Sequence, residues 1–173
     1  SVAHRLPAGG RVLCLAEGEG RNAVWLAEKG WEVTAVDFSQ VGLDKGQQLA
    51  AKRGVQVAWQ HADARQYEPE SGAFDLVVIL YLQMPFADVA PALRRAAAAV
   101  APGGSLLLVG HDPTNIEQGH GGPQNDAVLY DADSVVGELQ GLTILEAGTR
   151  ERPVQTDAGE KIAIDCLVHA TRS

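Results

Sequence analysis

The segment from Val12 to Gly20, VLCLAEGEG, constrains the fold more than any other part of the sequence. It is an apolar run that ends in two glycines, and it leads into a helical segment, RNAVWLAEKG, and a second apolar run, WEVTAVD. Gly18 and Gly20 allow a strand to turn sharply into a helix and allow backbone N–H groups to approach a ligand closely. Asp37 ends the second run, where a carboxylate can accept hydrogen bonds from both hydroxyls of a ribose. The pattern predicts a βαβ unit that holds an adenosine-like group.

The composition suits one compact domain. The chain has 173 residues, 46% of them hydrophobic, and we expect residues 1–173 to form a single domain. The net charge of −8 argues against a nucleic-acid partner, because such partners are normally held by basic surfaces. No apolar run approaches the roughly 20 residues of a membrane-spanning helix, and no signal-peptide pattern opens the chain. We therefore expect a soluble, cytoplasmic protein without a membrane partner; the sequence indicates no particular oligomeric state.

Two cysteines, Cys14 and Cys166, lie in predicted strands among apolar neighbours, which is typical of buried, reduced thiols. Neither cysteine has a second Cys or a His at ligand spacing, and the five histidines are scattered along the chain. We therefore assign no metal site.

The first half of the chain alternates apolar runs with helical patterns. Strands are expected at residues 11–16, 31–36, 55–60 and 74–80, helices at 21–29 and between 39 and 54, and an irregular link at 65–73. Ser39 is a good N-cap for the second helix. Gly46 lies inside that helix and costs ~1 kcal/mol relative to alanine, so the helix must depend on packing.

The second half continues this pattern and then departs from it. We expect a helix from about Asp88 to Ala101 with Pro91 in its first turn, a sharp turn at residues 102–104 and a strand at 105–110. Residues 111–125 lack periodicity, which predicts a long loop, and such loops are often functional. A short helix at 132–139 and two strands at 142–150 and 161–171, joined by a turn at 156–159, close the chain.

No helix fits between the last two strands, so they should be antiparallel to each other. The fold class expected is α/β, a doubly wound Rossmann-like sheet of seven strands, mostly parallel with an antiparallel final strand. Ligands of such sheets bind at the carboxyl edge, so the strand tips should converge on one crevice. The glycine spacing alone also fits a dinucleotide fingerprint, which leaves an NAD(P)-dependent oxidoreductase as an alternative.

Taken together, these segments resemble the class I S-adenosylmethionine-dependent methyltransferases, and within them the small tellurite-resistance-type methyltransferases. The resemblance runs over essentially the whole chain. It is carried by VLCLAEGEGRNAVWLAEKGWEVTAVDFS, the HADA after the third strand, FDLVVILYLQMP and AVAPGGSLLLVGHD, and GHGGPQND is similar to the variable loop of that group. The HADA and AVAPGG segments favour a methyltransferase over the oxidoreductase.

The resemblance implies S-adenosylmethionine as cofactor, S-adenosylhomocysteine as its product, and a small-molecule acceptor such as a thiol, a metalloid oxyanion or a hydroxyl compound. Asp37 would hold the ribose, Phe38 would lie against the adenine, and Asp63 would accept a hydrogen bond from the adenine amino group. The backbone N–H of Ala64 would reach a ring nitrogen, and Leu80 would lie beneath the sulfonium. The full set of expected cofactor residues is Ala16, Glu17, Gly18, Gly20, Asn22, Asp37, Phe38, Asp63, Ala64 and Leu80.

The acceptor pocket is expected beside the strand ends that follow the fourth and fifth strands. A thiol or an oxyanion needs no base, whereas a hydroxyl acceptor does, and His111 is the catalytic candidate for that role. The residues expected to line this pocket are Tyr81, Gln83, Met84 and His111.

The sequence departs from the family pattern in two places. Cys14 stands where many members have Asp or Glu, Ala16 replaces the usual first glycine, and Glu17 is the candidate to supply the lost carboxylate. Relatives commonly carry an N-terminal segment that folds over the cofactor, and we expect this lid to be missing here and cofactor affinity to be weak. A non-catalytic S-adenosylmethionine-binding module is therefore a further alternative.

Overall fold

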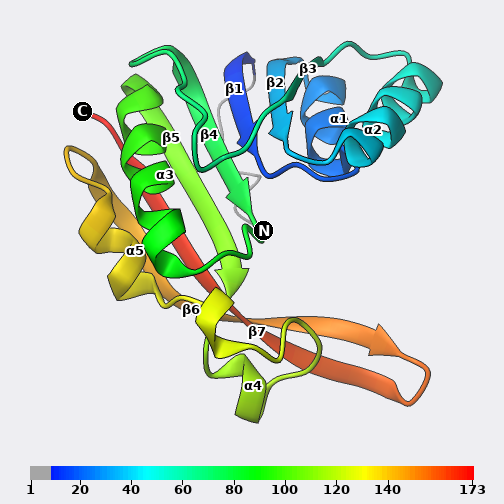
Figure 1. Cartoon of the computed structure of the whole chain (residues 1–173), viewed down its shortest axis with the longest axis vertical. Coiled ribbons are helices and arrows are strands. Elements are labelled where there is room, and N and C mark those ends of the chain that lie inside the picture. Colours follow the sequence, from blue (N-terminus) through cyan, green and yellow to red (C-terminus); the bar gives the residue numbers. More distant parts are fainter. Residues whose placement is uncertain (1–8) are drawn as a thin grey trace.

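The computed structural model describes residues 9–173 and contains one seven-stranded sheet in the order β3-β2-β1-β4-β5-β7-β6 (Figure 1). The strands are β1 (Gly10–Leu15), β2 (Trp31–Asp37), β3 (Ala58–His61), β4 (Phe74–Leu80), β5 (Val100–His111), β6 (Thr143–Thr156) and β7 (Gly159–Thr171). The first five strands pair in parallel, and β7 is antiparallel to both β5 and β6. The predicted doubly wound α/β sheet with an antiparallel final strand is confirmed.

Helices cover both faces of the sheet (Figure 1). The helices are α1 (Arg21–Glu28), α2 (Gln40–Arg53), α3 (Phe86–Ala99), α4 (Asn115–Gln118) and α5 (Ala132–Glu138). Alternate residues of β1 point to opposite faces, so Val12 and Cys14 join the core beneath α1 while Leu13 and Leu15 join the core beneath α3. All four side chains are at most 4% exposed, so the central strand is buried on both faces.

The two cysteines lie within this core. Cys14 and Cys166 are buried and free of disulfide bonds, as the sequence predicts. Over residues 9–173, every helix is too short or too polar to span a lipid bilayer.

The helix α2 begins and ends where the sequence indicates. The hydroxyl of Ser39 accepts a hydrogen bond from the backbone N–H of Gly42 at 3.1 Å, and Gly54 ends the helix in a left-handed conformation. Gly46 explains why α2 can pack closely against Trp59 and against the turn that contains Gly20. A Cβ atom at Gly46 would lie 2.6 Å from the ring of Trp59 and 3.3 Å from the Cα of Gly20.

Some predicted boundaries are wrong. β3 begins at Ala58 rather than Val55, because the N–H of Val55 still donates to Ala50 and completes the end of α2. α3 begins at Phe86, directly after Pro85, so Pro91 lies inside the helix and not in its first turn.

The expected sharp turn at residues 102–104 belongs to β5. The pairing of β4 with β5 passes from Phe74–Val100 directly to Leu76–Ser105, so the intervening residues bulge out of the ladder. The backbone of Gly103 and Gly104 is bonded to Arg172 at the end of the chain, which holds the bulge at the sheet.

The loop expected at 111–125 contains the short helix α4. Asn115 organises it: its side-chain nitrogen donates to the carbonyl of Gly121 at 2.8 Å, and its side-chain oxygen accepts from the N–H of Ile164 at 2.7 Å. A 3-10 turn at Asp126–Val128 follows. The β6–β7 hairpin is also longer than predicted and extends beyond the end of β5 (Figure 1). The remaining elements lie within one residue of their expected bounds.

The packing at Gly46 predicts that Gly46→Ala destabilises the protein. Alanine gains ~1 kcal/mol of helix propensity, but crowding against Trp59 should outweigh this gain and lower the free energy of unfolding by roughly 1–2 kcal/mol. Gly137→Ala in α5 is the matched control, because a Cβ atom there meets nothing within 4 Å. Urea denaturation should show a loss for the first variant and a small gain for the second. A Gly46→Ala protein at least as stable as the wild type would contradict this packing.

Candidate functional site

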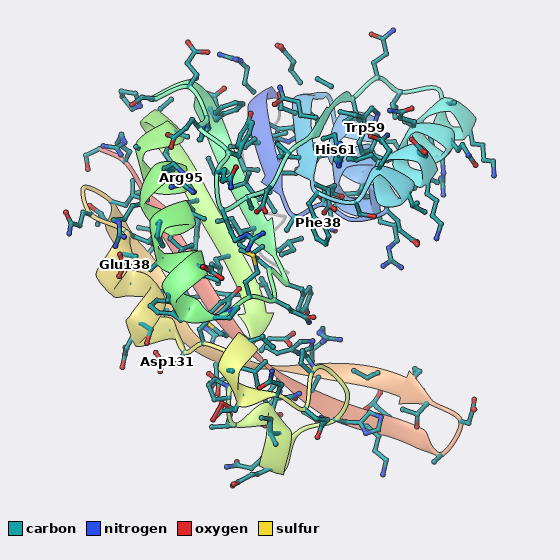
Figure 2. All side chains as sticks on the ribbon, viewed as in Figure 1. Phe38, Trp59, His61, Arg95, Asp131 and Glu138 are labelled. Atoms are coloured by element: carbon teal, nitrogen blue, oxygen red, sulfur yellow. The ribbon has the colours of Figure 1, made fainter. Side chains whose placement is uncertain are left out.

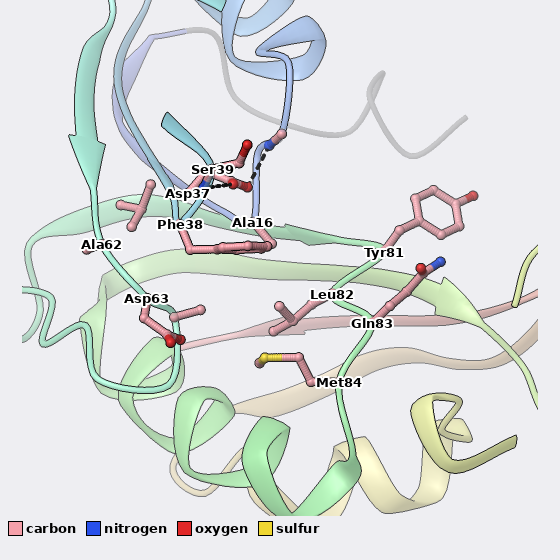
Figure 3. A pocket seen from close by; sticks show the side chains of 13 residues that line it. Ala16, Asp37, Phe38, Ser39, Ala62, Asp63, Tyr81, Leu82, Gln83 and Met84 are labelled. Carbon is pink, nitrogen blue, oxygen red and sulfur yellow. Dashed lines mark hydrogen bonds between the residues drawn. The ribbon is translucent and has the colours of Figure 1, made fainter. Parts of the chain in front are cut away.

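A cavity of about 430 Å³ lies at the carboxyl ends of β1, β2 and β4 and beside the segment that follows β3 (Figure 3). The predicted site residues that line it are Ala16, Gly18, Asp37, Phe38, Asp63, Ala64, Tyr81, Gln83 and Met84. The lining residues that the sequence reasoning missed are Val36, Ser39, Ala62 and Leu82. Each of these residues is adjacent in the sequence to a predicted one, so extending each predicted strand end by one residue would have found them.

Asp37 connects the first two strand ends at the wall of this cavity. Its carboxylate accepts hydrogen bonds from the backbone N–H of Gly18 and of Ser39, both at 2.8 Å (Figure 3). The Asp37 residue is buried, yet it lines the cavity. Since a carboxylate has about four acceptor positions, two remain for hydroxyl groups of a ligand.

Phe38 and the segment after β4 form a flat, largely apolar slot. Phe38 is 74% exposed, and its ring lies across the cavity from Leu82 and Met84 (Figure 3). Asp63 and Ala64 close one end of the slot. An apolar slot with few polar groups at its edge suits a planar heterocycle such as a purine.

Backbone strain is concentrated at this cavity. In the described part of the chain, Ala16 (φ 57°) and Tyr81 (φ 56°) are the non-glycine residues with left-handed φ angles, and both line the cavity. Such a conformation costs roughly 1–2 kcal/mol for an L-residue and persists where the surroundings impose it. Tyr81 is held by a hydrogen bond from its N–H to Val109 at 2.7 Å. Glycine is the residue that such a φ angle favours, so Ala16 holds this conformation at a cost that glycine would not have.

Four predicted cofactor residues lie outside the cavity wall: Glu17, Gly20, Asn22 and Leu80. The carboxylate of Glu17 accepts from the backbone N–H of Asn22 at 2.9 Å and of Ala23 at 2.8 Å, so it caps the start of α1. Gly20 faces α2 and Trp59, as described above. Leu80 packs with the core beneath α1.

Glu17 is 8% exposed, and its ionisation is perturbed. Burial raises the pKa of Glu17 to about 7, and the neighbouring Asp37 carboxylate adds to the increase. Hydrogen bonds from the two α1 amides and from the Cys14 thiol oppose it. Glu17 therefore places a carboxyl group of raised pKa inside the turn that connects β1 to α1, between the Cys14 thiol and the backbone amides of α1.

A second group of polar side chains lies beyond Tyr81 and is centred on Asp165. Asp165 is 3% exposed and accepts from the Tyr81 hydroxyl at 2.9 Å and from two nitrogens of Arg152 at 2.6 and 3.2 Å. The prediction that His111 lines the acceptor pocket is wrong for this cavity: its ring packs beside that of Tyr81, with centroids 4.8 Å apart and planes tilted by 45°. Asp165 and Arg152 lie in the closing hairpin, where no spacing in the sequence distinguishes them from other strand residues.

His111 faces Asp165 through Nδ1 at 3.3 Å, but the two groups are not aligned as a hydrogen bond. Burial lowers the pKa of His111 more than Asp165 raises it, so the imidazole is neutral at pH 7. Over residues 9–173, no three His, Cys, Asp or Glu side chains gather where they could hold a metal ion.

The comparisons with known proteins agree with this geometry. A family model described as "Methyltransferase domain" matches residues 12–104, which is more than half of the chain. The chain belongs to this family, the class I S-adenosylmethionine-dependent methyltransferases, whose cofactor is S-adenosylmethionine.

Among curated proteins, the chain is similar to a demethylmenaquinone methyltransferase of Thermus thermophilus, with 37% identity over 105 residues, 60% of this chain and 48% of that protein. It is also similar to a ubiquinone biosynthesis O-methyltransferase of a Caulobacter species, with 33% identity over 101 residues, 58% of this chain and 40% of that protein. The chain thus spans about half the length of the curated relatives it matches.

Solved structures share the fold at low sequence identity. A methyltransferase from Methanosarcina mazei has a TM-score of 0.77 at 16% identity, covering 99% of this chain and 97% of that one. TehB from Haemophilus influenzae has a TM-score of 0.82 at 16% identity, covering 99% of this chain and 60% of that one.

The buried carboxylate of Glu17 predicts an unusual pH dependence. Its pKa in the folded state, about 7, exceeds the ordinary value of 4.5, so the folded protein holds this proton more tightly than the unfolded chain. The contribution of Glu17 to stability is therefore greatest below pH 4.5 and falls by about 3 kcal/mol as the pH rises to 7.

In Glu17→Gln, the amide oxygen can still accept both helix N–H groups, which the structure bonds to a single oxygen. We expect urea denaturation at pH 5, 6, 7 and 8 to show that the wild type loses stability relative to Glu17→Gln across this window. A constant difference between the two proteins at all four pH values would contradict the raised pKa of Glu17.

Proposed function

We propose that the chain binds S-adenosylmethionine in the 430 Å³ cavity and transfers its methyl group to a small-molecule acceptor. The observation that carries the proposal is the Asp37 carboxylate, which is fixed to the glycine turn after β1 and lines the cavity with acceptor positions to spare. The residues present fit an adenosyl group, because the slot beside Phe38 is largely apolar and is lined by two acidic residues, Asp37 and Asp63.

The residues assigned to the cofactor divide into those that would touch it and those that support the turn. Asp37 would hold the ribose hydroxyls, Phe38 and Leu82 would enclose the adenine, and Asp63 would accept from its amino group. Gly18 has open space above its Cα, which allows the methionine portion to approach the backbone. We assign Glu17, through its bonds to α1, to holding this turn in shape.

The bound cofactor would supply an activated sulfonium methyl group. The residues of the chain would then have to hold the attacking atom of the acceptor in line with the sulfur–methyl bond and exclude water. We assign Tyr81, Gln83 and Met84, which form the wall after β4, to this task. For a hydroxyl acceptor, we assign removal of the proton to His111, which lies behind the wall residue Tyr81 and whose imidazole burial keeps neutral at pH 7.

The class of acceptor is supported by the names of two relatives, a demethylmenaquinone methyltransferase and a ubiquinone biosynthesis O-methyltransferase. We also propose that residues 1–173 act as one domain, and that the chain belongs to the tellurite-resistance-type group, on the sequence segments quoted above and the shared fold of TehB. An acceptor that is a thiol or a metalloid oxyanion would use the same wall without a base.

Loss of the Asp37 carboxylate should abolish cofactor binding. In Asp37→Ala, we expect the Kd for S-adenosylhomocysteine in isothermal titration to rise by roughly 100-fold, because two charge-assisted hydrogen bonds are lost. Asp75→Ala is the matched control: Asp75 accepts a backbone N–H from Arg11 at 2.8 Å but does not line the cavity. NADH should not bind the wild type. Unchanged affinity in Asp37→Ala, or binding of NADH instead, would remove the assignment.

His111→Ala should separate the acceptor classes. Methyl transfer to a hydroxyl acceptor should fall by roughly 10²–10⁴-fold, the usual contribution of a general base, while transfer to a thiol should be preserved. His120→Ala, in the exposed part of the same loop, serves as the control. An assay of both acceptors with radiolabelled cofactor measures this division. If neither acceptor is affected, His111 has no catalytic role; if neither is methylated by the wild type, a non-catalytic binding module is favoured.

A further inference from the structure

The cavity runs across several strand ends, and its two ends differ. Asp63 and Ala64 follow β3, whereas Tyr81 and Gln83 follow β4 at the other end of the wall (Figure 3). In the sheet order β3-β2-β1-β4, these ends are three strand spacings, about 14 Å, apart. Because the adenine is assigned to the β3 end, the methyl acceptor would lie at the β4 end.

Over residues 9–173, the cavity wall contains two carboxylates, Asp37 and Asp63, and no basic side chain. The cations near the β3 end already have partners. Arg65 donates to Asp63, and Arg95 of α3, labelled in Figure 2, donates to backbone carbonyls of the turn after β3, including that of Ala64. A negatively charged acceptor would therefore need a cation that stands behind the wall at the β4 end.

Arg152 of β6 is a cation in that place. Its guanidinium carbon lies 5.5 Å from the centre of the Tyr81 ring. Its Nε and Nη2 atoms donate to the two oxygens of Asp165, and Nη1 takes no part in this pairing. The side chain of Asp165 is 4% exposed, whereas that of Arg152 is 42% exposed. The pair therefore buries its negative end and keeps its positive end accessible beside Tyr81.

The pairing also fixes the plane of the guanidinium and leaves one edge of it for a ligand. Asp165 occupies the edge formed by Nε and Nη2, and the other edge consists of Nη1 and Nη2. Two terminal nitrogens can donate in parallel to the two oxygens of a second carboxylate. The nearby wall residues Leu82 and Met84 are apolar and suit a carbon skeleton. A compound with an apolar body and a carboxylate matches both features.

Stability alone does not account for this ion pair. The desolvation of two buried charges offsets most of their mutual attraction, so apolar side chains of similar volume would hold the hairpin equally well. We propose that Arg152 binds a carboxylate of the methyl acceptor, and that the acceptor is therefore an organic acid. Asp165 is the positioning residue that orients the guanidinium. The inference rests on the proposed function, since it takes the acceptor to lie beside Tyr81.

The test is isothermal titration of benzoate and of its neutral isostere, benzamide, into the protein loaded with S-adenosylhomocysteine. The wild type should prefer benzoate by roughly tenfold or more, because a charge-assisted, bidentate pair forms with the carboxylate alone. In Arg152→Gln, the two affinities should agree within about twofold. In Arg152→Lys, which keeps the charge beside Asp165 but lacks the planar fork, the preference should fall by roughly threefold.

Arg150→Gln is the matched control. Arg150 lies two residues earlier on β6 and so on the same face of the hairpin, its side chain is 53% exposed, and it pairs with Glu146. This variant removes the same charge, and the preference for benzoate should stay within twofold of the wild type. The Kd for S-adenosylhomocysteine, measured in every variant, shows that the cofactor site is still folded.

The ratio of the two affinities separates a binding role from a structural one. A structural role would weaken benzoate and benzamide by the same factor in Arg152→Lys, and that result would overturn the proposal. Equal binding of both compounds by the wild type, or binding of neither, would also overturn it while leaving the proposed function standing. Tighter binding of selenite than of benzoate would replace the organic acid with an inorganic oxyanion. A wild type that does not bind S-adenosylhomocysteine would contradict the proposed function and the role of Arg152 with it.

Discussion

Burial of β1 on both faces is the constraint on which the rest of the structure depends. Its side chains alternate between the core beneath α1 and the core beneath α3, so no polar group from the strand body can reach a ligand. The polar groups that can bind a ligand or react with it are therefore confined to the ends of the strands. The carboxylate of Asp37 then connects those ends, because it binds the turn after β1 while belonging to β2. The position of the cavity follows from these two facts.

The site is held in place mainly by backbone contacts. Ala16 and Tyr81 adopt strained φ angles, and the backbone N–H of Tyr81 is held by the carbonyl of Val109 in β5. Glu17 and Arg95 contribute in a similar way from outside the cavity wall. The first caps α1 from beneath, and the second binds three carbonyls of the turn after β3. Neither side chain lines the cavity, yet each determines where a lining residue lies.

Much of the fold could be predicted from local patterns. Apolar runs, glycines and the Ser39 cap have direct physical meaning, so the sheet class, the parallel core and the cavity-lining strand ends could be read from residue order. The wrong boundaries have a common cause. Val55 is excluded from β3 because its N–H completes the end of α2, and Pro91 lies inside α3 because that helix begins directly after Pro85. Both outcomes depend on the neighbouring backbone and not on the residue itself.

The site was harder to predict where contacts join distant segments. Asp165 lies opposite His111 at the end of β5, and Arg152 lies in the part of the hairpin beyond that end; both meet Tyr81 only through the packing of the hairpin, which nothing in its residue spacing indicates. Likewise, Glu17 follows the strand in sequence like a ligand-binding residue, but its side chain turns under α1 to satisfy the helix amides. The sequence pattern could identify which strand ends line the cavity, whereas the direction of each side chain depends on tertiary packing.

The most direct test of the assigned cofactor site is a crystal structure of this chain grown with S-adenosylhomocysteine. We expect density for the adenosyl group between Phe38 and Leu82, with both ribose hydroxyls within hydrogen-bond distance of Asp37. Density for the ligand elsewhere on the molecule, or an adenosyl group in the cavity that makes no contact with Asp37, would contradict the assignment of this site.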